Sequence, residues 1–168
     1  MTSTERRATD DLHSESPATE GPGSVSPHSV RPAEPRSQNI AASLPFNNNL
    51  TGAVVRLEPF QREHVPSLKQ LAFAHREEFR LTSTPSDDAQ ANTYFSKALR
   101  QRAEGTGHPV AVVLKESGKV IGMSRLSEVD FGHRRCELGF SWYDPSLFRS
   151  GVNLDSKLLL LRFAFDGL

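Results

Sequence analysis

The pattern of apolar and polar positions becomes regular near residue 50 and then changes period several times. Residues 53–58 alternate between the two kinds, which predicts a β-strand that a proline ends. Apolar residues at helical spacing predict a helix over residues 63–79, with a proline tolerated in its first turn. A second helix is predicted from Ser86, at a helix-start signal, to about Gly105. The chain therefore opens with a strand and two helices.

Shorter apolar runs with the period of strands follow these helices. Residues 110–114 and 120–126 flank a turn that contains a glycine, which predicts a hairpin. Residues 134–143 predict a further strand, and a helix that begins near Leu154 comes last. The apolar residues of the further strand are expected on one face: Cys136, Leu138, Phe140 and Trp142. The order β-α-α-β-β-β-α predicts an α/β fold with a mixed, largely antiparallel sheet flanked by helices.

Residues 1–49 differ in composition from the rest of the chain. They hold six of the eleven prolines and a single phenylalanine, Phe46. A segment this poor in apolar residues cannot offset the entropy of ordering it. We therefore predict a disordered leader over residues 1–49 and a domain over residues 50–168, and we favour a simple leader over a phosphorylatable tail or a docking arm.

Charge balance and cysteine content exclude several classes of protein. The chain has 20 basic and 20 acidic residues, so we expect no surface for nucleic acid or for an anionic membrane. It has no apolar run of the ~20 residues that span a bilayer and no apolar secretory signal. A single cysteine, Cys136, fits a reducing cytoplasm. The histidines lack metal-ligand spacing, and Cys136 and His133 would project to opposite strand faces, so we predict neither a metal site nor a cysteine nucleophile.

The loop before the last helix has the residues of a phosphate-binding site. The start of a helix leaves N–H groups unpaired and carries partial positive charge, and a glycine lets the backbone approach a ligand closely. Residues 149–153 would present a row of such amides, with the charge of Arg149 beside them. The alternative is an ordinary helix start with Asn153 as N-cap, in which Asp155 already offsets part of the helix dipole.

The order of elements and several segments together resemble the GNAT family of acyl-CoA-dependent N-acetyltransferases. The resemblance covers about Leu50 to Leu168 and is closest to the RimJ/RimL-like branch. It is most specific in the segments RRCELGFSWYDP and RSGVNLDSKLLLLRFAFDGL. The resemblance implies a GNAT-like sheet and acetyl transfer from acetyl-CoA to a primary amine, either a protein N-terminus or a small molecule.

The resemblance also implies roles for particular residues. The pyrophosphate of acetyl-CoA would lie on the loop residues Arg149, Ser150, Gly151, Val152 and Asn153. The pantetheine arm would run beside the strand at Ser141, Trp142 and Tyr143. Glu137, the one carboxylate placed within that strand, is the candidate base that deprotonates the amine. The alternative for Glu137 is an ion pair on the sheet surface with Arg125, Arg134 or Arg135.

Two departures from the family pattern bear on these roles. The family loop begins with Gln or Arg where this chain has Phe148, and only Gly151 of its small residues matches. The family's fifth strand, fourth helix and closing hairpin would come after Leu168, so we expect a partial domain with an open sheet edge. Apolar residues of the last helix would lose part of their cover: Leu158, Leu159, Leu161, Phe163 and Phe165.

A partial domain leaves three interpretations. The first is an N-acetyltransferase with weak or no activity in the truncated chain. The second is a non-catalytic fragment that binds a partner through its open edge or forms a swapped homodimer. The third is a coding sequence that continues past codon 168. Acetyl-CoA binding, a concentration-dependent oligomer and the nucleotide sequence would distinguish the three.

Overall fold

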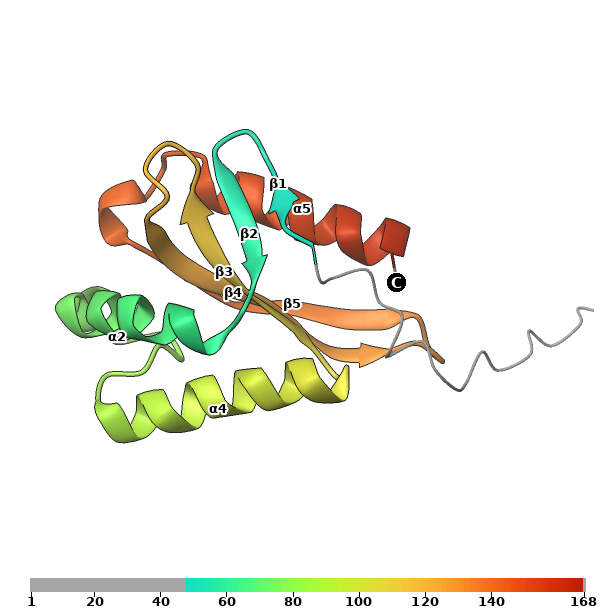
Figure 1. The fold of residues 1–168 in the computed structure, drawn as a ribbon, viewed down its shortest axis with the longest axis horizontal. Helices are drawn as coiled ribbons and strands as arrows, with labels where there is room; N and C mark the ends of the chain where they lie inside the picture. The colour runs from blue at the N-terminus through green and yellow to red at the C-terminus, as the bar shows by residue number, and fades with distance from the viewer. Residues whose placement is uncertain (1–47, 168) are drawn as a thin grey trace, which may run out of the picture. The chain divides into compact units, whose positions relative to one another are not determined.

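The computed structural model describes residues 48–167 (Figure 1). The predicted leader lies outside these residues up to position 47. Five strands form one sheet in sequence order, with every neighbouring pair antiparallel. The strands are β1 (Leu50–Thr51), β2 (Val55–Pro59), β3 (His108–Leu114), β4 (Val120–Asp130) and β5 (Arg135–Tyr143). The predicted antiparallel sheet with flanking helices is therefore confirmed.

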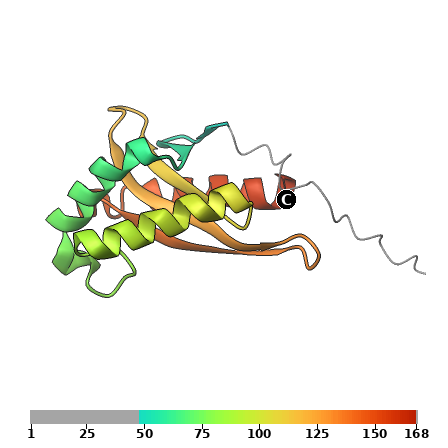
Figure 2. The same cartoon turned by 60° about the horizontal axis from the view of Figure 1, so that its bottom comes forward.

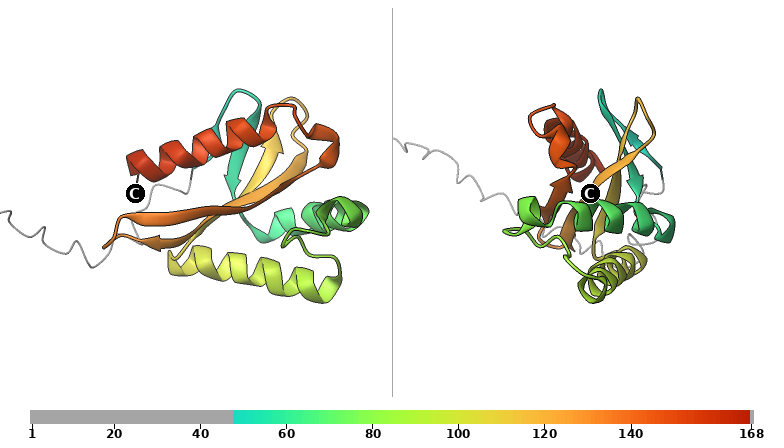
Figure 3. Two further views of the ribbon diagram at one scale, coloured as in Figure 1. Left: turned by 180° about the vertical axis from the view of Figure 1, so that it is seen from behind. Right: turned by 90° about the vertical axis from the view of Figure 1, so that its left-hand side faces the viewer.

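Helices cover both faces of this sheet. The α-helices are α2 (Val65–Ala74), α3 (Arg76–Phe79), α4 (Asp88–Glu104) and α5 (Val152–Gly167). Two 3₁₀ turns, η1 (Arg62–His64) and η2 (Pro145–Leu147), precede α2 and the last loop. Helices α2 and α4 share one face, as Figure 2 shows, and α5 lies on the other (Figure 3). Two apolar clusters fill the layers, one between the sheet and α5 and one between the sheet and α2, α3 and α4.

The first predicted helix is broken in two. Residues 63–79 form a 3₁₀ turn, α2 and α3, and the break falls at His75, which has φ −126° and ψ 40°. Helix α2 buries Leu68 and Leu71 over the sheet. Helix α3 instead packs Phe79 against Trp142 in a T-shaped arrangement, with 5.6 Å between the ring centres. The break therefore lets one apolar stripe contact two different parts of the core.

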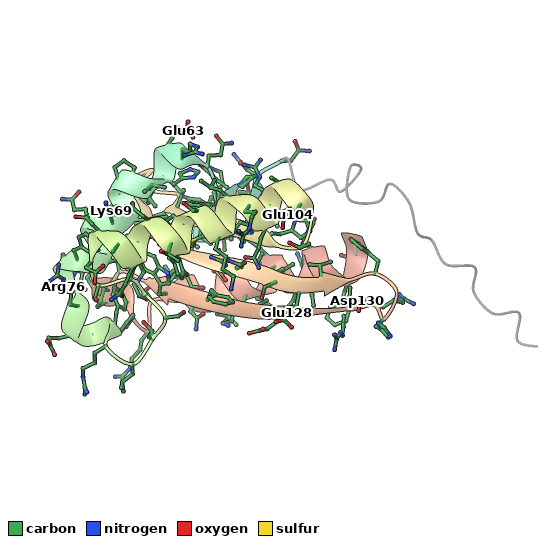
Figure 4. All side chains as sticks on the ribbon, turned by 90° about the horizontal axis from the view of Figure 1, so that it is seen from below. Glu63, Lys69, Arg76, Glu104, Glu128 and Asp130 are labelled. Carbon is green, nitrogen blue, oxygen red and sulfur yellow. The ribbon has the colours of Figure 1, made fainter. Side chains whose placement is uncertain are left out.

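Helix α4 matches the helix predicted from Ser86 to about Gly105 closely. Its N-cap is Asp87, whose side chain accepts a hydrogen bond from the Gln90 N–H at 2.8 Å. It ends at Gly105, which has φ 69° and therefore the left-handed conformation that glycine favours. Figure 4 shows this helix crossing the sheet, with Arg76 near one end of the face and Asp130 at the tip of the β4–β5 hairpin near the other.

The predicted alternation of strand β5 is wrong beyond Gly139. Phe140 has φ 53°. The pairing changes from Arg125↔Gly139 to Met123↔Trp142, so β5 advances three residues while β4 advances two. This extra residue is a β-bulge, and it reverses which side chains face which way. Leu138 therefore packs toward α5, whereas Trp142 packs toward α2, α3 and α4.

Helix α5 begins at Val152, two residues before the predicted start, so Asn153 lies in its first turn and is not the N-cap. Three of the five apolar residues expected to lose cover are exposed: Leu158 at 50%, Leu161 at 42% and Phe165 at 84%. Phe163 is buried, because it packs in the cluster between α5 and the sheet. No helix among the described residues is long and apolar enough to cross a bilayer.

Candidate functional site

A pocket of about 680 Å³ opens where β5 ends and α5 begins. Helix α3 closes one side of it through Glu78 and Phe79. Seven of the eight predicted binding residues line it: Ser141, Trp142, Tyr143, Arg149, Gly151, Val152 and Asn153. The fold therefore brings the end of one strand and the glycine loop, which the sequence analysis joined only by resemblance, into one cavity.

Ser150, the eighth predicted residue, does not line this pocket. Its N–H donates to the Leu147 carbonyl at 3.2 Å, and its hydroxyl donates to the same oxygen. The Ser150 amide is thus already used by the loop and cannot also bind a phosphate there. Ser150 therefore differs from the other seven predicted residues, which line the pocket.

The other loop amides are arranged differently. Arg149 has φ 66° and Gly151 has φ 87°, so two left-handed residues turn the chain into α5. The N–H groups of Gly151, Val152 and Asn153 have no acceptor within residues 48–167. Unpaired N–H groups at the start of a helix, together with the helix dipole, attract anions. This end of the pocket can therefore bind a phosphate group.

Asp155 does not compete for that position. Its carboxylate accepts the backbone N–H groups of Ala53, Val54 and Val55 at 3.1, 2.7 and 2.9 Å. Burial raises the pKa of Asp155, but these three hydrogen bonds outweigh it and hold the pKa below its ordinary value. The expectation that Asp155 offsets part of the helix dipole is therefore incomplete, because the residue also ties α5 to the start of β2.

Two basic side chains stand at the pocket. Arg149 lines it and is exposed, as predicted, and Lys157 lines it from the second turn of α5. Neither forms an ion pair with another described residue. Lys157 was not among the predicted binding residues, although its spacing of four from Asn153 places both on one face of a helix.

The end of β5 is held by contacts on both faces of the sheet. The Trp142 indole N–H donates to the Tyr94 hydroxyl at 3.2 Å on the α4 side. On the α5 side, the Tyr143 hydroxyl and Ser156 Oγ are 2.9 Å apart. Burial raises the pKa of Tyr143 above its ordinary value, so the phenol stays protonated. These contacts fix the strand end while its edge away from β4 pairs with no strand of the described part of the chain.

Glu137, the candidate base, lies outside this pocket. It is exposed, pairs across the sheet with Ser127, and its side chain lies over Gly139, where an added Cβ would be 2.9 Å from Glu137 Oε1. Ser141 lies four positions further along the chain, which is roughly 13 Å along an extended strand. Glu137 and the binding residues thus share one strand but not one cavity.

The alternative expectation for Glu137, an ion pair on the sheet surface, is not met in the described residues. No ion pair joins it to Arg125, Arg134 or Arg135 among the described residues, and Arg135 instead lies 3.8 Å from Asp130. Arg125 is not on the sheet surface at all, since it is 1% exposed beneath α4. The sequence analysis missed this burial because the arginine sits in an otherwise ordinary strand pattern.

Cys136 has no nucleophile partner either. His133 pairs with Asp130 at 2.7 Å, and the Cys136 thiol packs toward α5. Burial raises the pKa of the thiol, which disfavours the reactive thiolate. No three His, Cys, Asp or Glu side chains come together as a possible metal site anywhere in the part of the chain that the structure covers.

Comparisons with solved structures agree with this fold. A GCN5-related N-acetyltransferase from Brucella melitensis is 24% identical, with a TM-score of 0.60 over 73% of this chain and 57% of its own. RimJ from Mycobacterium smegmatis in complex with CoA-disulfide is 17% identical, with a TM-score of 0.60 over 71% and 61%. A Salmonella typhimurium acetyl transferase described as modifying the N-terminal serine of ribosomal protein L7/L12 is 15% identical, with a TM-score of 0.62 over 71% and 70%.

These matches show the fold, and the chain spans about 57–70% of the length of the proteins it resembles. No curated protein matches the sequence. The family model "Acetyltransferase (GNAT) domain" matches residues 55–168, which is more than half of the chain and includes the whole pocket. The chain belongs to the GNAT acetyltransferase family.

Proposed function

We propose that this chain forms the acetyl-CoA-binding part of an N-acetyltransferase that acts on a primary amine. The observation that carries the proposal is the group of unpaired N–H groups at Gly151, Val152 and Asn153, which faces a pocket with two cations. The diphosphate of coenzyme A would accept from these amides, and Arg149 and Lys157 would balance its charge. Phe148 adds exposed apolar surface at the same opening rather than a further hydrogen bond.

The open edge of β5 suits the rest of the donor. Its unpaired backbone groups lead from the pocket toward Gly139 and Glu137, so an amide-containing arm would add to the sheet like a strand. Acetyl-CoA would supply the acetyl group as a thioester, whose C–S bond would break as the C–N bond to the amine forms, so that coenzyme A would leave as the thiolate. Glu137 would take a proton from the attacking amine, either directly or through a water, since the side chain is solvent-exposed and has no partner in the described region.

The acceptor is a finer part of the proposal. The Salmonella neighbour is described as modifying an N-terminal serine, which favours a protein N-terminus over a small amine. Neighbours of the RimJ and RimL type support the same branch for this chain. The exposed position of Glu137 on the α4 side fits a bulky acceptor that approaches from solvent.

Isothermal titration with acetyl-CoA tests the donor site. We expect saturable binding that weakens about tenfold in the double variant Arg149→Ala/Lys157→Ala, because two charge-assisted contacts are lost. Arg162→Ala is the matched control, since Arg162 is an exposed cation of α5 away from the pocket. No binding, or equal weakening by both changes, would contradict the proposal.

A second candidate function follows from the exposed apolar face of α5. Leu158, Leu161 and Phe165 lie exposed on the helix, and the edge of β5 beside it is open. Such a surface favours association with another chain, including a second copy. Light scattering over a hundredfold range of concentration tests this role. A constant monomer mass would exclude it.

A further inference from the structure

Arg125 of β4 is buried with part of its guanidinium unpaired. The residue is 1% exposed, and Nη1 donates to Gln101 Oε1 at 2.7 Å. Nε and Nη2 are also buried, and neither has a hydrogen-bond partner within residues 48–167. Ser127, two residues along the same strand face, likewise buries an Oγ without a partner there. Three buried polar atoms on this face of β4 thus have no hydrogen-bond partner among residues 48–167.

The aromatic neighbours explain only part of this arrangement. The guanidinium carbon lies 4.6 Å from the centre of the Phe140 ring and 5.2 Å from that of Tyr94. Rings in contact with a guanidinium stabilise its charge. They do not accept its in-plane N–H groups, and a buried N–H without an acceptor costs free energy. The Nε and Nη2 groups therefore still lack partners.

The two unpaired groups form a specific shape. Nε–H and an Nη2–H point from the same edge of the planar group, and this edge matches the two oxygens of a carboxylate. A compact point charge such as lysine would offer no such fork. The nearest acidic residue in register is Glu137, which pairs with Ser127 but forms no ion pair with Arg125. No carboxylate of residues 48–167 therefore occupies this edge of Arg125.

Phe140 gives a route to this edge. Its ring contacts the guanidinium and is half-buried, and its φ of 53° marks it as the bulge residue of β5. A non-glycine residue in this conformation is strained, and such strain is common where a structure changes around a ligand. Rotation of the Phe140 side chain toward solvent would open Arg125 to the surface on which Glu137 lies.

We propose that the Nε–Nη2 edge of Arg125, assisted by Ser127 Oγ, binds a carboxylate of the acceptor, so that the enzyme prefers amines with an acidic group nearby. This inference rests on the proposed amine acetylation. Arg125 pairs across the sheet with Gly139, the residue over which the Glu137 side chain lies, so the acceptor's amine would be held near the candidate base. Arg125 is a specificity-determining residue in this arrangement.

Matched acceptors test the preference. Two tripeptide amides, Ser-Asp-Phe and Ser-Asn-Phe, differ only in a carboxylate and a carboxamide of equal size. With the unmodified chain we expect kcat/KM at least tenfold higher for the Asp peptide, because an arginine site that lacks its anion leaves polar groups unpaired. In Arg125→Met the ratio should fall to within about twofold of one, whereas Arg100→Met, which removes an exposed arginine of α4, should keep it. An unchanged ratio in Arg125→Met would overturn the inference.

A binding measurement separates this inference from the proposed activity. The Nε–H signal of Arg125 in a ¹H–¹⁵N spectrum should shift saturably with the Asp peptide and remain unchanged with the Asn peptide. Acetyl-CoA titration of Arg125→Met should match the unmodified chain, which shows that the variant is folded and that the donor site is separate. A shift with both peptides, or with neither, would refute the carboxylate site even if acetyl transfer is established. Failure of acetyl-CoA binding alone would refute only the donor site.

Discussion

Buried polar side chains on the two faces of the sheet differ in whether they have hydrogen-bond partners in the described part of the chain. On the α5 face, Ser124 and Ser141 lie 2.8 Å apart through their hydroxyls, and Tyr143 lies 2.9 Å from Ser156. On the α4 face, Arg125 buries two nitrogens that have no partner in the described part of the chain. Because buried polar groups are normally satisfied, the hydroxyls on the first face stabilise the fold itself. On the second face, the unpaired edge of Arg125 is the site that we propose for the acceptor's carboxylate.

The largest expected effect is on the α5 face, at Asp155. Asp155→Ala removes the acceptor of three backbone N–H groups, at Ala53, Val54 and Val55. Hydrogen bonds to a charged group contribute more than neutral ones, so we expect a loss of about 2–4 kcal/mol in the free energy of unfolding, measured with urea. Asp166→Ala, at an exposed carboxylate of the same helix, is the control and should change the value by less than about 0.5 kcal/mol. If the two changes lowered the free energy of unfolding equally, the hydrogen bonds from Asp155 to the start of β2 would not be the source of the stabilisation.

The same carboxylate predicts a pH dependence. Its pKa is lowered in the folded chain, so its contribution is complete above the ordinary aspartate pKa of about 4 and is lost as the pH falls through the folded value. Between pH 6 and pH 3, the free energy of unfolding measured with urea should therefore fall more for the unmodified chain than for Asp155→Asn. Parallel losses in the two proteins would contradict the pKa shift.

A smaller effect is expected at the buried hydroxyl pair of the α5 face. Tyr143→Phe leaves Ser156 Oγ without the phenol at 2.9 Å, and we expect a loss of about 1 kcal/mol. In a Ser156→Ala background the same change should cost less, because the hydrogen bond is already absent. Additive losses in the double variant would show that the two hydroxyls do not interact.

Local sequence patterns predicted the glycine loop and the order of the main elements, but not the short strand β1 or the break between α2 and α3. They missed what depends on a single backbone angle or on tertiary burial. The φ of Phe140 reverses the faces of β5, and nothing in the residue type announces it. The sequence pattern places Arg125 on the surface of the sheet, because it does not show that α4 covers it. The pattern likewise assigns Asp155 to the helix dipole, because it does not show that β2 lies beside α5. The direction of Glu137 depended on the same bulge, so the sequence alone left it open.

The smallest expected change is on the α4 face, at Arg125. Arg125→Met keeps a long side chain and removes two unpaired buried nitrogens together with the single hydrogen bond from Nη1 to Gln101 Oε1. Replacing a poorly paired buried charge with an apolar residue is often neutral or stabilising. We expect the free energy of unfolding to change by less than about 1 kcal/mol. Arg102→Met is the matched control, because the Arg102 guanidinium donates to the Phe60 carbonyl at 2.9 Å and buries no unpaired nitrogen in the described part of the chain. If Arg125→Met were the more damaging of the two, the arginine would be a structural residue, and the contrast between the two faces would disappear.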